Sequence, residues 1–181
     1  MIPELPKKKF HYNITKHGII TGIYFNYILE NIYNLIDSRK SISVLDFGCG
    51  YGYLKRKFKK NKKIKVINFD IIDEFTEIKD WKKIKFDYLI STHVFYLFTK
   101  KKLDKLLLDL KKHNPKLILI VTISKQGLLN NLGKILLNEP DAHKGTVLNP
   151  DQEFKAITKR MKVIKKKNIL LLNDMYLLEF L

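Results

Sequence analysis

Three glycines at alternate positions, Gly48, Gly50 and Gly52, follow an apolar run in the segment VLDFGCGYGYL. The run over residues 41–47 predicts a buried strand, and the basic segment after the glycines predicts a helix. Glycine lets the backbone approach a bound molecule closely because it has no Cβ atom. The chain is therefore constrained to a fold in which a strand, a bare loop and a helix meet at a ligand.

Predicted strands and helices alternate along the rest of the chain. Apolar residues recur at helical spacing over 14–36, and Leu54 and Phe58 repeat that spacing after the glycines. Such alternation indicates one α/β domain, residues 1–181, with a Rossmann-like, doubly wound, mostly parallel sheet, helices on both faces and an antiparallel C-terminal hairpin. We expect strands over 41–47, 64–70, 86–91 and 117–123, two final strands joined at Asn173–Asp174, and helices after Thr99, over 125–137 and after Asn149.

The glycine spacing excludes two common phosphate-binding loops. The dinucleotide fingerprint needs its third glycine where Tyr53 stands, and no Gly-Lys-Ser/Thr follows to make a P-loop. Asp46, just before the loop, would repel a pyrophosphate and suits a cation instead. We therefore expect a ligand without a pyrophosphate.

The formal net charge of +17 would suit an acidic partner such as nucleic acid or an anionic lipid surface. Among the 35 basic residues, however, only Arg39, Arg56 and Arg160 are arginine, the side chain that phosphate and base readers favour. We interpret the lysines as a solvated surface in preference to an anion-attracting face. The run KRKFKKNKKIK over residues 55–65 receives the same interpretation, as a solvated helix face.

The chain carries one cysteine, Cys49, so it forms no internal disulfide, and a reducing, cytoplasmic location is expected. Its N-terminus lacks the apolar core of a signal peptide, and no apolar stretch reaches the length of a membrane span.

VLDFGCGYGYL resembles the first motif of class I S-adenosylmethionine-dependent methyltransferases, and the resemblance extends over residues 41–181. It implies that Asp46 and the glycine loop hold the methionyl part of the cofactor and that Asp70, in VINFD, binds the ribose hydroxyls. FDYLISTHVFYLF resembles the motif at the methyl end. The resemblance implies S-adenosylmethionine as cofactor and no metal, with these cofactor-binding residues: Asp46, Gly48, Cys49, Gly50, Gly52, Asp70, Ile71, Asp80, Trp81 and Ser91.

The stretch between Asp70 and Asp87 departs from the family pattern. Its sixteen residues, IIDEFTEIKDWKKIKF, are too few for the family's helix and full strand, so we expect a short strand and a loop. The family's adenine contact would fall at Asp80 beside Trp81, although Trp81 could equally be a core aromatic.

STHVFYLF resembles the small-molecule branch of this family, which acts on small molecules, quinones, lipids and sugars. The resemblance implies a small or lipid-like acceptor, and we predict methylation on oxygen. Pyrimidine methylation at carbon needs a nucleophilic cysteine, and Cys49 lies within the cofactor loop. The family's Asp/Asn-Pro-Pro-Tyr signature for nitrogen acceptors is absent after the fourth strand, where STHVFYLF stands. His143 and His93 are the candidate bases, and Tyr12 and His17 are further candidates.

Two other segments complete the prediction. Residues 1–40 are expected to form a helical segment that covers the site. The leucine-rich stretch 127–137 is either ordinary core or the lining of an apolar acceptor pocket, with peripheral membrane contact as a further option. Two alternative functions stay open, a nucleic-acid methyltransferase and a catalytically silent cofactor-binding scaffold.

Overall fold

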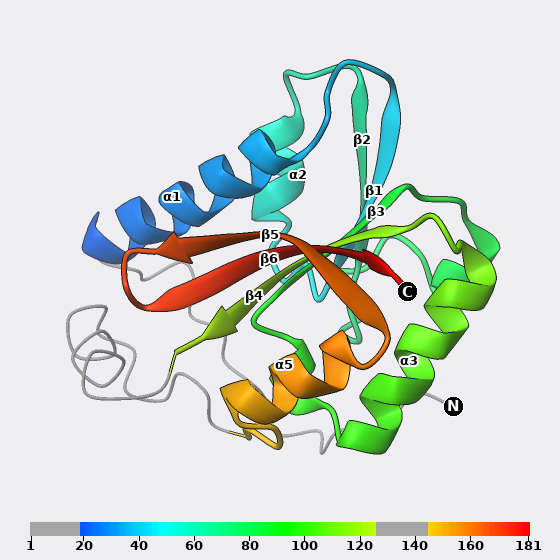
Figure 1. Ribbon diagram of the computed structural model, residues 1–181. Coiled ribbons are helices and arrows are strands. Elements are labelled where there is room, and N and C mark those ends of the chain that lie inside the picture. The colour runs from blue at the N-terminus through cyan, green and yellow to red at the C-terminus, as the bar shows by residue number, and fades with distance from the viewer. Residues whose placement is uncertain (1–18, 126–144) are drawn as a thin grey trace.

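A computed structural model describes residues 19–125 and 145–181, which form a six-stranded sheet in the order β2-β1-β3-β4-β6-β5 (Figure 1). Four neighbouring strands run parallel, and β6 runs antiparallel to both β4 and β5. The predicted mostly parallel sheet with an antiparallel C-terminal hairpin is confirmed. The strands are β1 (Ile42–Phe47), β2 (Ile64–Phe69), β3 (Tyr88–Thr92), β4 (Ile118–Ser124), β5 (Met161–Ile169) and β6 (Asn173–Phe180).

Helices cover both faces of the sheet, as predicted. Helices α1 (Ile19–Leu35) and α2 (Tyr53–Phe58) lie on one face, and α3 (Lys100–His113) and α5 (Pro150–Thr158) on the other (Figure 1). Successive strand residues point to opposite faces. Val44 accordingly belongs to the core cluster under α1 and α2, whereas Leu45 belongs to the cluster under α3 and α5.

Local capping chemistry fixes where two helices begin. The Thr99 side chain accepts a hydrogen bond from the Lys102 backbone N–H at the start of α3. Asn149 and Gln152 form a reciprocal capping box at the start of α5, with Pro150 in the first turn. Both starting points were predicted, because each depends on residues only three positions apart.

The short strand expected between Asp70 and Asp87 is absent from this fully described stretch, and that prediction is wrong. The segment is irregular except for a single 3-10 turn, η2 (Trp81–Lys83). Glu77 takes the place of a neighbouring strand, because its N–H donates to Asn68 O at 3.0 Å and its Oε2 accepts from Asn68 N at 3.2 Å. One residue thus satisfies the outward-facing backbone groups of Asn68, near the carboxyl end of β2, where the family places another strand.

The turn of the C-terminal hairpin also lies elsewhere than predicted. Asn173 does not join the strands but begins β6, and the turn covers residues 170–172. Leu170 and Leu171 take positive φ values of 47° and 63°, and the Leu172 N–H donates to Ile169 O at 3.0 Å. An Asn side chain supports the turn from the other strand, since Asn168 Oδ1 accepts from the Leu171 N–H at 2.9 Å.

Asn173 is buried because it joins the hairpin to the first helix. Its Nδ2 donates a hydrogen bond to the Tyr24 hydroxyl, which brings α1 to the start of β6. Ser124 at the carboxyl end of β4 pairs with Asn173 across the sheet, so the N-terminal half of α1 lies towards the carboxyl edge of the parallel strands. Residues 1–18 and the predicted helix over 125–137, except Lys125, lie outside the described residues.

Candidate functional site

The glycine loop follows the carboxyl end of β1, between β2 and β3. Gly48, Gly50 and Gly52 all have positive φ values, of 78°, 48° and 69°. This left-handed backbone is costly for residues with a Cβ atom, which explains the alternate glycines. The loop folds back on β2 because the N–H groups of Gly48 and Cys49 both donate to Phe69 O, at 2.8 and 3.2 Å.

Neighbouring side chains also leave no room for a Cβ atom at Gly48 or Gly52. A Cβ atom on Gly48 would lie 2.3 Å from Cγ2 of Val94, in the segment after β3. A Cβ atom on Gly52 would lie 2.7 Å from Nδ2 of Asn68 in β2. The loop is therefore held between the ends of its two neighbouring strands, at the point where the strand order reverses and α/β sheets bind ligands.

Asp70 binds the glycine loop directly. One carboxylate oxygen, Oδ2, accepts from the Gly50 N–H at 3.0 Å, and the other, Oδ1, accepts from the Ile72 N–H at 3.0 Å. Each carboxylate oxygen has a further lone pair for a ligand hydroxyl. Ile71 follows with 53 % of its surface exposed, and thus offers an apolar side chain beside the Asp70 carboxylate.

Asp46 lies buried at the end of β1, only 6 % exposed. None of the described residues donates a hydrogen bond to its carboxyl group. Burial, and then the negative charge of Asp70, raise the pKa of Asp46 to about 7. A cation bound near this pair of carboxylates would favour the ionised form of Asp46.

The Cys49 thiol is buried inside the same loop, and its Sγ lies 3.3 Å from Phe75 O. Burial raises the pKa of this thiol, and the charges of Asp46 and Asp70 raise it further. A thiol with a raised pKa is a poor nucleophile, because the thiolate is the reactive form. The geometry agrees with the expectation that Cys49 does not attack a substrate.

Ser91 and His93 lie at the carboxyl end of β3. Ser91 is fully buried, and its Oγ has no hydrogen-bond partner among the described residues. His93 has a positive φ of 57°, and its Nδ1 forms a hydrogen bond of 3.2 Å with Oγ of Ser124, the last residue of β4. The ring of His93 is thus held at the carboxyl ends of the parallel strands, where the glycine loop also lies.

Asp80 and Trp81 have structural contacts. Asp80 Oδ1 accepts from the Lys82 N–H at 3.0 Å and so caps the 3-10 turn. Trp81 is buried against Phe86 and His113, with ring centroids 6.2 and 5.7 Å away. A cofactor contact by these two residues stays a prediction.

The other predicted site residues, His143, Tyr12 and His17, lie outside the described residues. Within residues 19–125 and 145–181, no cluster of His, Cys, Asp and Glu side chains could hold a metal ion. No helix in those same ranges has the length and apolarity to cross a membrane.

Sequence reasoning missed the residues that contact the site from other elements. Val94 and Asn68 fill the space beside two glycines, Ser124 contacts His93, and Glu77 hydrogen-bonds to the backbone of Asn68 in β2. These side chains reach the site only through the folded sheet. The ends of parallel strands could have indicated Ser124, whereas no local pattern marks Val94 or Glu77.

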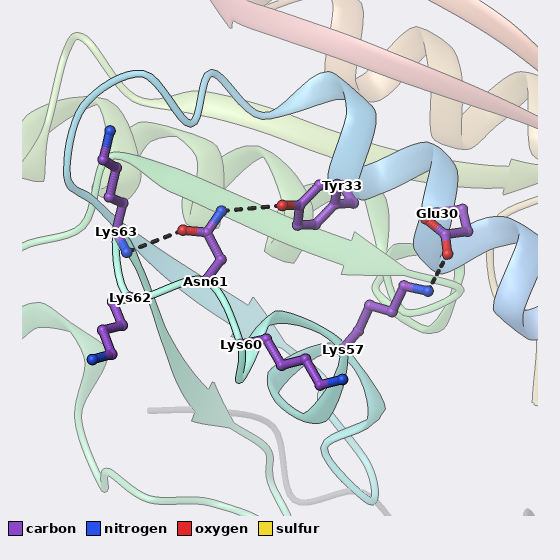
Figure 2. Close-up of a pocket in the computed structure, with 7 residues that line it drawn as sticks. All are labelled: Glu30, Tyr33, Lys57, Lys60, Asn61, Lys62 and Lys63. Carbon is purple, nitrogen blue, oxygen red and sulfur yellow. Dashed lines mark hydrogen bonds and ion pairs between the residues drawn. The ribbon is translucent and has the colours of Figure 1, made fainter.

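A second feature lies at the opposite edge of the sheet. Residues from α1, from α2 and from the turn before β2 line a cavity of about 580 Å³ (Figure 2). The turn precedes β2, whereas the glycine loop follows β1, which is parallel to β2. About 20 Å of strand therefore separates the two features. The cavity is lined by Glu30, Tyr33, Lys57, Lys60, Asn61, Lys62 and Lys63.

No protein-family model and no curated protein sequence matches this chain. Solved structures do. The chain is similar to N,N-8-amino-8-demethyl-D-riboflavin dimethyltransferase (RosA) from Streptomyces davawensis, with a TM-score of 0.64 and 11% identity over 87% of this chain and 55% of that one. It is also similar to human N-acetylserotonin methyltransferase in complex with SAM (TM-score 0.57, 17% identity, 89% of this chain and 58% of that one).

A further similar structure is a SAM dependent methyltransferase from Aquifex aeolicus, with a TM-score of 0.58 and 16% identity over 84% of this chain and 89% of that one. This chain thus spans little more than half the length of RosA and the human enzyme, but most of the length of the Aquifex protein. The sheet order, the loop at the switch point and these similarities lead to one conclusion: the chain has the fold of the class I S-adenosylmethionine-dependent methyltransferases.

Proposed function

We propose that this protein binds S-adenosylmethionine and transfers its methyl group to a small-molecule acceptor, with oxygen as the atom methylated. One observation carries the proposal. The left-handed glycine loop is tied by the Gly50 N–H to Asp70, at the switch point of a sheet whose structural neighbours include S-adenosylmethionine-dependent methyltransferases.

The chemistry of the loop fits this cofactor. Asp46 and Asp70 supply negative charge, which suits the sulfonium and amino groups, and Asp70 retains acceptor capacity for ribose hydroxyls. The left-handed glycine backbone carries no side chain at Gly48, Gly50 and Gly52, and the exposed Ile71 offers an apolar surface to adenine. Gly52 and Cys49 complete the loop. Asp80, Trp81 and Ser91 are proposed to contact the cofactor further from the loop.

When bound, the cofactor supplies a methyl group that is already activated by its sulfonium. The protein then has to position the acceptor, exclude water and accept a proton if the acceptor is a hydroxyl. His93, held at the end of β3 by Ser124, is one proposed base. His143 is the other, and the segment that includes it is proposed to meet the acceptor.

The acceptor class rests on the similar structures and on the missing signatures in the sequence. RosA and the human enzyme are named for a riboflavin derivative and for N-acetylserotonin, both small molecules. The absence of the nitrogen-acceptor signature after β3 favours oxygen. We further propose that the chain is one domain, with residues 1–40 covering the site.

Calorimetry with S-adenosylmethionine and its demethylated product tests cofactor binding. We expect micromolar affinity, roughly −8 kcal/mol, for the unmodified protein. Asp70→Ala should weaken binding by about 1–3 kcal/mol, because it removes a charged acceptor and frees the Gly50 N–H. Asp73→Ala is the matched control, since this exposed carboxylate lies three residues away. An unmodified protein that binds neither compound would refute the proposal.

Turnover needs a separate test, because a silent scaffold would also bind cofactor. Transfer of a labelled methyl group to components of a small-molecule extract would identify an acceptor. His93→Ala is expected to lower both cofactor affinity and rate, and His143→Ala to lower the rate alone by about 10²–10⁴. If the protein binds cofactor but transfers no methyl group to the small-molecule extract or to RNA, the result would instead support a catalytically silent scaffold.

A further inference from the structure

Four lysines from two segments line the cavity at the amino ends of the parallel strands. Lys57 comes from the end of α2, and the other three come from the turn that joins α2 to β2 (Figure 2). Helix α1 closes the other side with Glu30 and Tyr33. A volume of about 580 Å³ is within the range of small-ligand sites.

The polar groups in this cavity are mostly donors. Asn61 donates from Nδ2 to the Tyr33 hydroxyl at 3.2 Å, so the hydroxyl hydrogen of Tyr33 stays available to a ligand. The side-chain oxygen of Asn61 is occupied, because Oδ1 accepts from the Lys63 N–H at 3.1 Å. Lys63 Nζ donates one hydrogen to Arg39 O at 3.3 Å and keeps two others.

The charge in the cavity is also unbalanced. Glu30 is its single carboxylate, and an ion pair with Lys57 occupies it. No described residue pairs with the ammonium groups of Lys60 and Lys62. The cavity therefore presents positive charge and hydrogen-bond donors, with little free acceptor capacity. An anion rich in oxygen acceptors complements this arrangement.

The lining contains one aromatic ring, Tyr33, beside the aliphatic stems of its lysines. Tyr33 packs against Phe58 with ring centroids 5.1 Å apart, so one face of its ring is already covered. A ligand that depends on base stacking would therefore find at most one free ring face. Lysines are also point charges that recognise phosphate without reading base edges.

We propose that this cavity is a binding site for phosphate groups, separate from the glycine loop and independent of methyl transfer. The phosphates belong either to a free polyphosphate or nucleotide, or to the backbone of a nucleic acid bound without regard to sequence. Under this proposal, the run over residues 55–65 is more than the solvated helix face that its sequence predicts.

Two titrations at 20 mM salt test the site and identify the source. Calorimetry measures the binding affinity for inorganic tripolyphosphate, and fluorescence anisotropy measures the affinity for a labelled 20-nucleotide poly(U) RNA. Both titrations are done without cofactor and with a chelator present. We expect tripolyphosphate to bind. RNA that binds at least tenfold tighter and is displaced by tripolyphosphate identifies a nucleic-acid backbone as the source, and RNA that binds no tighter identifies a free phosphate ligand.

Lys60→Gln/Lys62→Gln should weaken tripolyphosphate binding at least tenfold, while cofactor binding is unchanged. For RNA, the slope of log K against log salt should fall by about 1.4, the value for two phosphate contacts on a single strand. The control Lys101→Gln/Lys105→Gln removes the same charge from exposed positions on α3 and should change binding less than twofold.

Tyr33→Phe removes the hydroxyl donor without changing charge and should weaken tripolyphosphate binding several-fold. The proposal is overturned if the unmodified protein does not bind tripolyphosphate at 20 mM salt. It is also overturned if the α3 control loses as much affinity as Lys60→Gln/Lys62→Gln, because binding would then follow net charge alone.

Discussion

Gly48 and Val94 are in contact across the switch point, and a Cβ atom at position 48 would lie 2.3 Å from Cγ2 of Val94. These residues follow β1 and β3, strands that are neighbours in the sheet but far apart in sequence. The distance between the two loops is therefore set by a glycine in one and a β-branched side chain in the other.

Gly48→Ala should lower the free energy of unfolding by about 2–4 kcal/mol. Its φ of 78° disfavours a Cβ atom, and the clash with Val94 adds to the cost. Val94→Ala in the same chain should recover part of that loss, since it removes the clash but leaves the backbone strain. Denaturant titration of the single and double variants measures the cost of the clash and the cost of the backbone strain. Gly22→Ala is the control, because nothing lies near that glycine in α1; equal effects at positions 22 and 48 would contradict this account.

Cofactor affinity should rise with pH between 6 and 8. The pKa of Asp46 is about 7 in the free protein, so the carboxyl is partly protonated at neutral pH, and a cation would bind better to its ionised form. Calorimetry in buffers with different ionisation enthalpies should detect proton release on binding, largest near pH 6. Asp46→Asn should bind more weakly and without this pH dependence. A proton release that persists in Asp46→Asn would assign the titration to another group.

Features fixed by neighbouring residues could be predicted from the sequence, and features made by the folded sheet could not. Thr99, Asn149 and Pro150 mark helix starts because capping is local, and alternate glycines mark a left-handed loop. The contacts of Val94 and Glu77 form only after strands pair. The prediction of a short strand was wrong for this reason, since Glu77 pairs with the backbone of Asn68 in β2 without any strand pattern.

The hairpin turn was misplaced by a preference that is usually sound. Asn-Asp is a common turn pair, whereas Leu-Leu is not. Here Asn173 is needed inside the protein to donate to Tyr24, and the turn moved to two leucines with positive φ. A long-range hydrogen bond thus overrode a local preference.

Glu153 is a buried acid on α5 that should make stability depend on pH. It is 2 % exposed, its Oε1 has no partner among the described residues, and burial raises its pKa to about 8. Between its unfolded pKa of about 4.3 and 8 the folded state holds the proton more tightly, so stability falls as pH rises. Glu153→Gln should remove this fall, and its stability relative to the unmodified protein should increase by up to about 1.4 kcal/mol per pH unit in that window.

Denaturant midpoints at pH 5, 6.5 and 8 measure the effect of Glu153→Gln. Glu179→Gln on the exposed side of β6 removes the same charge and should show no such trend. A stability difference between Glu153→Gln and the unmodified protein that stays constant from pH 5 to 8 would show that Glu153 is ionised throughout.

Replacing the turn leucines should stabilise the protein. Leu170 and Leu171 are 52 % and 59 % exposed, so they contribute little burial, and each holds a left-handed backbone. Asn and Gly adopt that conformation at lower cost, so Leu170→Asn/Leu171→Gly should raise the free energy of unfolding by about 1–2 kcal/mol. Thermal and denaturant unfolding measure the gain. Leu171→Ala keeps the backbone strain and should give no gain; an equal rise there would point to the loss of exposed apolar surface instead.

β6 lies between β4 and β5 in the sheet. Among the described strands, β5 pairs with β6 alone, which follows it in sequence, so the parallel strands β2, β1, β3 and β4 can assemble before either hairpin strand joins the sheet. Until then the outer edge of β4 is open, and its sequence ILIVTIS carries no charge. Uncharged, apolar edge strands are templates for aggregation. Pairing of β6 with β4 therefore covers this apolar edge, and loss of residues 173–180 would expose it to intermolecular pairing.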